Sequence, residues 1–295
     1  CVPIVGVNRA EILAAAAALK ETPAHVAEWR ADWCSDILNE NGTPNLTAVT
    51  DILRQLRAVL GNMPLLFTFR TAAEGGERDI DFQSYKALNL AASGEGLADL
   101  ADVELFTAGD AAEAFIEELH KRGVKVVVSS HDFHQTPDEE VLIDRLCAMR
   151  KIGADLPKVA VMPQSRKDVL VLLKATETAS SLLDCPIITM SMSGTGVISR
   201  LCGEVFGSAM TFGSAGKASA PGQMDVQDCK SALQSGRPSD IKISAEPVPY
   251  RKLCLLQSRE ASVVSTNAEQ PQQPETKALG FRDCPASDLR SSGSR

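Results

Sequence analysis

The sequence predicts an α/β fold, a (β/α)8 TIM barrel, and three observations support this prediction. Short apolar segments alternate with longer helical patterns, and each short segment is followed by a loop rich in polar residues. Eight such units fit between residue 1 and residue 236, which is an ordinary length for one barrel. A doubly wound open sheet is the alternative, but the chain contains neither a GxGxxG nor a GxxxxGKS/T phosphate loop.

Eight segments are predicted to be strands because they are short, dense in apolar residues and bounded by turn residues. They cover residues 1–7, 24–30, 64–70, 100–106, 124–130, 157–162, 186–192 and 209–214. The helices predicted between them cover residues 9–21, 46–61, 82–93, 111–123, 137–153 and 166–183. Gly61, Gly123 and Gly153 end three of these helices, as glycine commonly does at a helix C-terminus.

We expect two regions in the chain. Residues 1–236 form the (β/α)8 catalytic domain, because the strand–helix pattern stops after about Gly236. Residues 237–295 are of low complexity, with "NAEQPQQPETK" and "SSGSR" rich in Pro, Gln, Ser and Glu, and only a short apolar patch at "YRKLCLLQ". Such a composition buries too little apolar surface to offset chain entropy, so it predicts a disordered C-terminal tail.

Composition limits the class of partner. With 44% apolar and 23% charged residues, the 295-residue chain is typical of a soluble globular protein. A net charge of -8 argues against nucleic-acid binding, so an anionic ligand requires a local group of cations. No apolar run approaches the length of a membrane span, and because Cys1 begins on strand-like sequence we expect no signal peptide. The eight cysteines are scattered without a CxxC pair, which favours reduced thiols in the cytoplasm over a zinc site or a disulfide framework.

A lysine stands inside a predicted strand. Lys158 lies in "ADLPKVAVMPQS", a segment whose centre is otherwise apolar. Lysine is depleted in strands and is seldom buried without a partner, so two interpretations are open. Either the side chain points outward at an edge, or it is held inside the barrel for its chemistry.

Polar residues gather at the carboxyl ends of the predicted strands, where the active sites of barrels lie. They are Glu28, Arg30, Arg70, Glu74, His131, Lys158, Arg200, Ser219 and Gln223. Each has a plainer explanation, since a histidine after a strand is often a core or loop residue and a strand-end arginine is often solvated. Equally, "EGGE" can be a turn and "SAPGQ" a flexible loop. Gathered on one rim, they predict a site.

The segments "EWRAD", "LLFTFRTAAEGGE", "SSHDFHQTP", "PKVAVMPQS", "PIITMSMSGTGVISRLCGEVFGSAMTFG" and "KASAPGQ" resemble those of the type I 3-dehydroquinate dehydratases of the shikimate pathway. The resemblance covers about residues 1–235. It implies a (β/α)8 barrel that forms a homodimer, takes 3-dehydroquinate as its small-molecule substrate, and uses no cofactor and no metal. The implied reaction is a syn elimination of water that yields 3-dehydroshikimate through a lysine imine.

The resemblance also implies a role for each rim residue. Lys158 is the imine-forming nucleophile, His131 is the general base and acid, and Glu74 is the hydrogen-bond partner that orients His131. The substrate-binding residues are Glu28, Arg30 and Arg70 for the ring hydroxyls, Arg200 for the carboxylate, and Ser219 and Gln223 in a loop that closes over the ligand.

The chemistry explains these residue types. A protonated imine is a better electron sink than a ketone, but only an uncharged lysine can form it. Burial beside Arg30, Arg70 and Arg200 is expected to lower the pKa of Lys158. An imidazole suits the proton transfers because it titrates close to neutral pH, and a planar guanidinium suits a carboxylate because it makes two parallel hydrogen bonds.

Two other functions remain open at this stage. A class I aldolase also uses a Schiff-base lysine, although "EGGE", "SHDF" and "GVISR" are not expected there in this order. A non-catalytic sensor of quinate-type ligands, built on a dehydratase-like barrel, would bind without turnover. The presence of both Lys158 and His131 argues against such a sensor.

Overall fold

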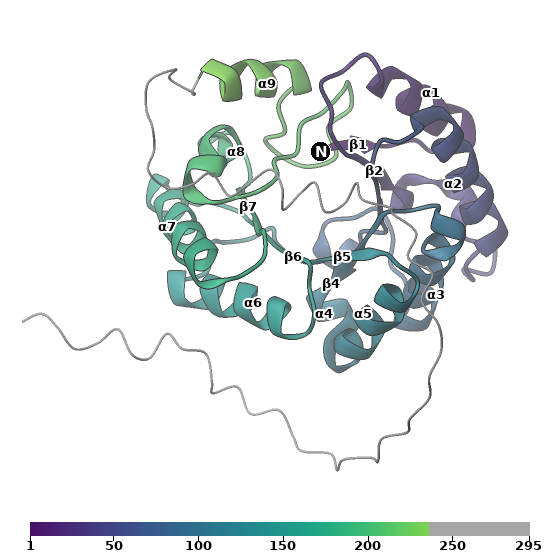
Figure 1. The fold of residues 1–295 in the computed structure, drawn as a ribbon, viewed down its shortest axis with the longest axis horizontal. Helices are drawn as coiled ribbons and strands as arrows, with labels where there is room; N and C mark the ends of the chain where they lie inside the picture. The colour runs from purple at the N-terminus through teal and green to yellow at the C-terminus, as the bar shows by residue number, and fades with distance from the viewer. Residues whose placement is uncertain (236–295) are drawn as a thin grey trace, which may run out of the picture. The chain divides into compact units, whose positions relative to one another are not determined.

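Seven parallel strands follow one another around a curled sheet in the order of the sequence, as the computed structural model of residues 1–235 shows (Figure 1). The strands are β1 (Val2–Ile4), β2 (Ala27–Arg30), β3 (Leu65–Thr68), β4 (Leu100–Glu104), β5 (Lys125–Asp132), β6 (Leu156–Val161) and β7 (Ile188–Ser191). Helices surround the strands, so the predicted α/β barrel is confirmed. The tail predicted to be disordered, residues 237–295, lies outside the described residues.

An eighth segment closes the sheet, although it is not a regular strand. The Ala209 N–H donates to the Ile187 carbonyl at 2.8 Å, on the side of β7. On the side of β1, the Gly213 N–H donates to the Cys1 carbonyl at 3.0 Å and the Cys1 amino group donates to the Thr211 carbonyl at 2.9 Å. The prediction of a full strand over 209–214 is therefore wrong, because the backbone bonds of this segment to the sheet are isolated ones to Ile187 and Cys1, and Ser214 pairs instead with Met224 and Val226.

The six predicted helices all form, each within two residues of its predicted ends. The helices of the described part of the chain are α1 (Arg9–Leu19), α2 (Leu46–Leu60), α3 (Phe82–Ala92), α4 (Leu105–Ala108), α5 (Ala112–Lys121), α6 (Glu139–Lys151), α7 (Arg166–Leu182), α8 (Val197–Cys202) and α9 (Val226–Ser235). The strand predicted over 100–106 is too long, because β4 ends at Glu104 and residues 105 and 106 belong to α4. The Glu104 carboxylate accepts a hydrogen bond from the Thr107 hydroxyl at 2.6 Å, which stabilises a helical turn directly after β4.

Alternate residues of the strands point into the barrel, and this alternation places the site. The deepest inward side chains are apolar and pack into one cluster that includes Val26, Leu66, Leu100, Val127, Leu156 and Ile188. Two residues further along the strands, the buried positions become polar: Glu28, Thr68, Asp102, Ser129 and Lys158. Because side chains on a strand repeat every two residues, these polar groups lie on the same inner face, above an apolar floor.

The outward-facing strand residues pack against the helices and hold the strands in place. Trp29 on β2 and Phe67 on β3 are paired in the sheet, with ring centroids 5.6 Å apart in an edge-to-face arrangement. The strands that carry the site therefore lie between two apolar layers, one inside the barrel and one between the strands and the helices. No helix among residues 1–235 is long and apolar enough to cross a membrane.

Candidate active site

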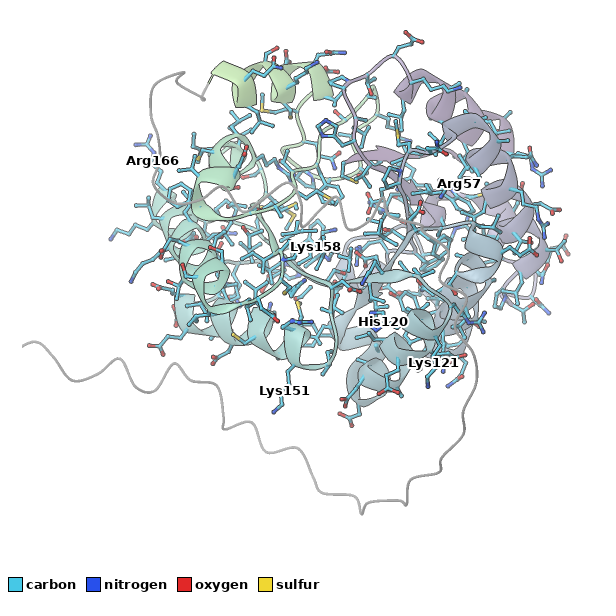
Figure 2. All side chains as sticks on the ribbon, in the orientation of Figure 1. Arg57, His120, Lys121, Lys151, Lys158 and Arg166 are labelled. Atoms are coloured by element: carbon cyan, nitrogen blue, oxygen red, sulfur yellow. The ribbon has the colours of Figure 1, made fainter. Side chains whose placement is uncertain are left out.

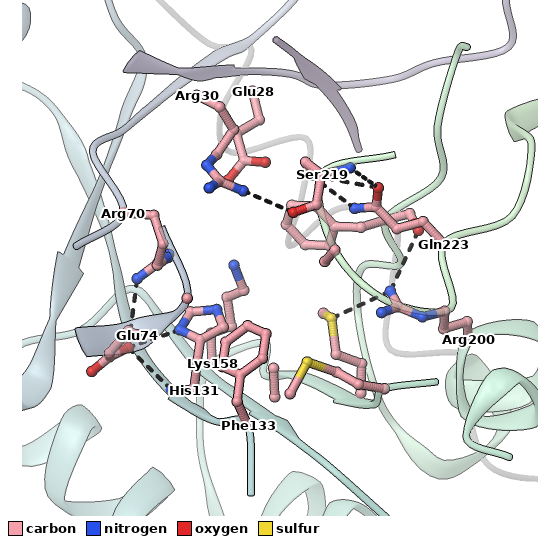
Figure 3. A pocket seen from close by; sticks show the side chains of 16 residues that line it. Glu28, Arg30, Arg70, Glu74, His131, Phe133, Lys158, Arg200, Ser219 and Gln223 are labelled. Atoms are coloured by element: carbon pink, nitrogen blue, oxygen red, sulfur yellow. Dashed lines mark hydrogen bonds and ion pairs between the residues drawn. The ribbon is translucent and has the colours of Figure 1, made fainter. Parts of the chain in front are cut away.

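All nine residues predicted from the sequence line one cavity at the carboxyl ends of the strands (Figure 3). Charged groups from β2, β3, β5 and β6 and their following loops form one part of its wall. Apolar and small residues complete the lining: Gly75, Phe133, Ala160, Met190, Met192, Phe212 and Ala220. The roles assigned to the nine residues remain predictions, but the structure does bring them together.

Lys158 lies inside the ring of strands, whereas Lys121 and Lys151 lie on the outer helices and are exposed (Figure 2). Only 5% of the Lys158 side chain is accessible to solvent. Its Nζ lies 3.7 Å from Asp102 Oδ2 and 4.5 Å from the centroid of the Phe212 ring. The outward-pointing interpretation of this lysine is therefore excluded.

The pKa of the Lys158 amine is lowered, as expected, and burial is the largest cause. Asp102 and Glu28 act in the opposite direction, because a nearby carboxylate favours the ammonium form. Arg70 and Arg30 are cations and lower the pKa further. The amine is thus more easily deprotonated than an exposed lysine, while it keeps two carboxylates in its surroundings.

His131 and Glu74 form a buried hydrogen-bonded pair. Glu74 Oε2 lies 2.8 Å from His131 Nδ1 and also accepts the His131 backbone N–H at 3.0 Å. Burial raises the pKa of Glu74 to about 8, against the opposing effect of Arg70. Burial, Arg70 and Lys158 lower the pKa of His131 well below its usual range. The pair therefore carries one proton over a wide range that ends near pH 8, and the Nε2 of the ring is left for a ligand.

Two glycines of "EGGE" allow the loop after β3 to reach this pair. Gly75 has a φ of +82° at the end of a 3-10 turn, Ala72–Glu74, and a Cβ there would lie 2.2 Å from the Phe133 ring. A Cβ on Gly76 would lie 1.9 Å from the Arg70 carbonyl oxygen. Both positions require glycine, so the motif is a packing requirement of the site as well as a turn.

Arg70 is the cation with the most partners in the site. Its Nη2 lies 2.9 Å from Asp102 Oδ1, and its Nη1 donates to Glu104 Oε1 at 2.9 Å and to Ser129 Oγ at 3.0 Å. Glu74 Oε2 is 3.6 Å away. These carboxylates raise the pKa of Arg70 well above its usual value although burial acts against them. The guanidinium is held in place and remains charged.

Asp102 and Glu104 were not predicted from the sequence. Both are fully buried on β4 in "LADVE", where they alternate with apolar residues. A strand of a parallel barrel is covered on both faces, so polar residues at a period of two can only point into the barrel interior. That periodicity was a usable signal for the two carboxylates.

On β2, the two predicted residues have separate partners. Arg30 makes a bidentate ion pair with Asp32, with Nε–Oδ1 at 2.8 Å and Nη2–Oδ2 at 2.7 Å, and its Nη1 donates to the Ser219 carbonyl at 3.2 Å. Glu28 Oε1 accepts a hydrogen bond from the Thr68 hydroxyl at 2.9 Å. Asp32, which the sequence analysis also missed, fixes the orientation of Arg30 toward the loop that contains Ser219.

Arg200, on α8, is buried without an ion pair among the described residues. Its Nη2 donates to the Pro221 carbonyl at 3.2 Å and its Nη1 to the Phe212 carbonyl at 3.5 Å. Its Nε is buried and has no hydrogen-bond partner. Burial lowers the pKa of Arg200 to about 10. A buried cation without a counter-charge is a natural receptor for an anion.

The loop between residues 214 and 225 covers the cavity on the side of Arg30 and Arg200. Gln223 Oε1 accepts the Ser219 N–H at 2.8 Å, and Gln223 Nε2 donates to the Ser219 hydroxyl at 3.1 Å. Outside the cavity, the Lys217 Nζ lies 4.0 Å from the centroid of the Trp33 ring. The loop thus contacts Arg30 and Arg200 through its carbonyl groups and Trp33 through its own Lys217. These contacts position it to act as a cover.

The fold and the cavity together define a class: a barrel enzyme with a buried lysine, a histidine–carboxylate pair and a receptor for an anion. Comparison with known proteins makes the class specific. The model of the family "Type I 3-dehydroquinase" matches residues 1–239. The chain therefore belongs to the type I 3-dehydroquinase family, and it is a hydro-lyase of the 3-dehydroquinate dehydratase type.

Relatives support this assignment over nearly their whole length. The 3-dehydroquinate dehydratase of Clostridioides difficile is 49% identical over 234 residues, covering 79% of this chain and 89% of the relative. That of Listeria innocua is 51% identical over 233 residues, covering 79% and 90%. Among solved structures, the Clostridium difficile type I enzyme with covalently modified comenic acid has a TM-score of 0.75 at 48% identity, covering 80% of this chain and 91% of its own. The Geobacillus kaustophilus dehydratase has a TM-score of 0.77 at 36% identity, covering 82% and 91%.

Proposed function

We propose that this dehydratase acts through an imine on Lys158, followed by a syn elimination of water from 3-dehydroquinate. The observation that carries the proposal is the burial in one cavity of three groups: Lys158 with its lowered pKa, the His131–Glu74 pair, and the unpaired cation Arg200. The Clostridium difficile relative was solved with covalently modified comenic acid, and covalent chemistry in this chain would be of the same general kind.

Imine formation begins with the uncharged amine. Lys158 Nζ attacks the C3 ketone. The resulting carbinolamine takes the proton of the His131–Glu74 pair through His131 Nε2 and loses water, which leaves a protonated imine. An ordinary lysine with a pKa near 10.4 is only about one-thousandth uncharged near neutral pH. The lowered pKa of Lys158 increases that fraction, which is the physical use of burying it.

His131 performs both proton transfers of the elimination. Its Nε2, which has given up its proton during imine formation, takes the C2 proton, and the electron pair moves toward the imine nitrogen to give an enamine. The imidazolium then donates its proton to the C1 hydroxyl, which leaves as water. One group acting from one face removes the proton and the hydroxyl from the same face, which is a syn course. Hydrolysis of the remaining imine releases 3-dehydroshikimate and restores Lys158.

The remaining predicted residues bind and position the substrate. Arg200 pairs with the C1 carboxylate, and this contact supplies the counter-charge that the buried guanidinium lacks. Glu28, Arg30 and Arg70 orient the ring hydroxyls and set the electrostatic field around the imine. The loop with Ser219 and Gln223 closes over the ligand, which excludes water and strengthens the contacts beneath it.

The test is turnover of 3-dehydroquinate, followed as the ultraviolet absorbance of the conjugated enone product. Lys158→Ala and Lys158→Arg should both be inactive while folded, because a guanidinium stays protonated and cannot act as the nucleophile. A normal rate in either variant would contradict the imine mechanism. Binding without turnover by the unaltered chain would instead favour the sensor.

We also propose that the chain works as a cytoplasmic homodimer that does not bind nucleic acid. The family resemblance supports the dimer, the scattered cysteines support the compartment, and the net charge of -8 argues against nucleic acid. Sedimentation equilibrium at micromolar concentration should give the mass of two chains, and a monomer mass would contradict this proposal.

A further inference from the structure

Asp102 is a fully buried carboxylate whose two oxygens have different surroundings. Oδ1 accepts a hydrogen bond from the Ser129 hydroxyl at 2.7 Å and lies 2.9 Å from Arg70 Nη2. Oδ2 is buried and has no hydrogen-bond partner. Its neighbour is Lys158 Nζ, at 3.7 Å. One oxygen thus completes the Arg70 network, while the other faces the amine.

The charges around Arg70 show why this second oxygen needs a cation. The single positive charge of Arg70 is in contact with both Asp102 and Glu104 at 2.9 Å. Glu74 shares a proton with His131 and adds little negative charge near neutral pH. Two carboxylates on one guanidinium leave an excess negative charge, and a buried excess charge is costly unless it is paired. Lys158 carries the positive charge that can balance it.

We infer that Asp102 is a positioning residue that acts as the counter-ion of the Lys158 nitrogen, first of the ammonium and then of the protonated imine. The inference deepens the proposed function and rests on it for the imine stage. The nitrogen keeps its place when the imine forms, so the carboxylate that holds the resting amine also faces the cationic intermediate. Asp102 therefore stabilises positive charge at the reacting nitrogen without touching the substrate.

Loss of Asp102 should have two opposing effects. The ammonium form loses its main attraction, so the pKa of Lys158 falls and the amine becomes neutral at lower pH. The protonated imine loses the same attraction, so the intermediate becomes less stable and turnover slows. A residue with a purely structural role would not shift the pKa of the amine.

The titration of Lys158 depends on all the groups that face it, and a test must separate Asp102 from the others. The charged and titratable groups of the cavity are Glu28, Arg30, Arg70, Glu74, His131 and Arg200, with Asp102 and Glu104 behind them. Glu104→Gln is a matched control, because Glu104 lies on the same strand, is equally buried and contacts the same guanidinium, through Nη1 where Asp102 contacts Nη2.

The experiment measures the pKa of Lys158 in the substrate-free enzyme, from the pH dependence of its acetylation by acetic anhydride, read by peptide mass spectrometry. Asp102→Asn should lower this pKa by about one unit or more, and Glu104→Gln should shift it by less than half as much. Asp102→Ser, a second neutral variant, should behave like Asp102→Asn if the latter is unstable. An unchanged pKa in a folded Asp102 variant, or an equal shift in Glu104→Gln, would overturn the inference.

A second measurement distinguishes this inference from the proposed function. Borohydride added with substrate should trap an adduct on Lys158 in the wild type. In Asp102→Asn, the acid limit of trapping, which is the pH below which no adduct forms, should move to lower pH. The kcat of this variant should fall at least about tenfold. If the wild type forms no adduct, the imine mechanism fails, and the acetylation result still decides whether Asp102 is the partner of the amine. If the wild type is trapped but the acid limit does not move in Asp102→Asn, the inference fails alone.

Discussion

Replacing Arg200 with methionine should weaken substrate binding while leaving the fold at least as stable. The guanidinium is buried, and burial lowers its pKa from the usual arginine range to about 10. At about 1.4 kcal/mol per unit, its charge costs the substrate-free protein roughly 3 kcal/mol. A cation with a lowered folded pKa is disfavoured at every pH below that value, so the cost is fully present at pH 7. Methionine fills the space without a charge and removes this cost.

The same substitution leaves the substrate carboxylate without its partner. Loss of a hydrogen-bonded ion pair costs about 1.5–3 kcal/mol, which corresponds to a rise in KM of roughly 10- to 150-fold with kcat little changed. Arg200→Lys is the matched control, since it keeps the charge but not the two parallel hydrogen bonds, and its KM should lie between those of the wild type and Arg200→Met.

Steady-state kinetics by enone absorbance and thermal unfolding test both halves of this reasoning. The expected pattern is a raised KM together with a midpoint of unfolding equal to or above that of the wild type. A loss of kcat at unchanged KM would refute the role of Arg200 as an anion receptor. A fall in the unfolding midpoint by several degrees would refute the claim that its burial is costly.

Three further predictions concern other parts of the site. His131→Ala should lower kcat by about a hundredfold or more with a smaller change in KM, and an effect confined to KM would show that His131 does not transfer the protons. In the folded protein the His131–Glu74 pair keeps one titratable proton up to about pH 8, whereas in the unfolded chain both side chains have released theirs near pH 6.5. The wild-type free energy of unfolding should therefore fall by about 2 kcal/mol as the pH rises between these values. Thermal unfolding across that window should show no such fall in Glu74→Gln, and parallel curves would contradict the shared proton. Lys217→Met should raise KM by about two- to fivefold because it loses the contact with Trp33, whereas Lys217→Arg should keep the wild-type KM. Identical kinetics in the two variants would argue against a role for that contact.

The sequence predicted the barrel because parallel strands buried on both faces produce continuous apolar segments, and seven of the eight lie in the sheet. The prediction from sequence failed where contacts with other parts of the chain determine the backbone conformation. Residues 105 and 106 are as apolar as the strand before them, yet they begin α4 after the Glu104–Thr107 hydrogen bond. Residues 209–214 have the composition of a strand, but Ser214 pairs with Met224 and Val226 and so leaves the sheet.

The site was predictable where a residue type is unusual for its position. Lys158 in an apolar strand is such a case, and so are the glycines beside Glu74. Asp32, Asp102 and Glu104 were missed because acidic residues are common near strand ends, and the partners of Asp102 and Glu104 come from other strands. Only the register of the sheet shows that Asp102 faces Arg70, Ser129 and the lysine.

The most direct test of the mechanism is to reduce the enzyme with borohydride in the presence of substrate and to locate the label by peptide mass mapping. The imine mechanism predicts inactivation, the added mass of one ligand per chain, and modification of Lys158 alone, with no effect of borohydride without substrate. His131→Ala should still accumulate the adduct slowly, because its amine is intact, whereas Lys158→Ala should form none. A label on Lys167 or Lys174, or full activity after reduction with substrate, would contradict the imine mechanism.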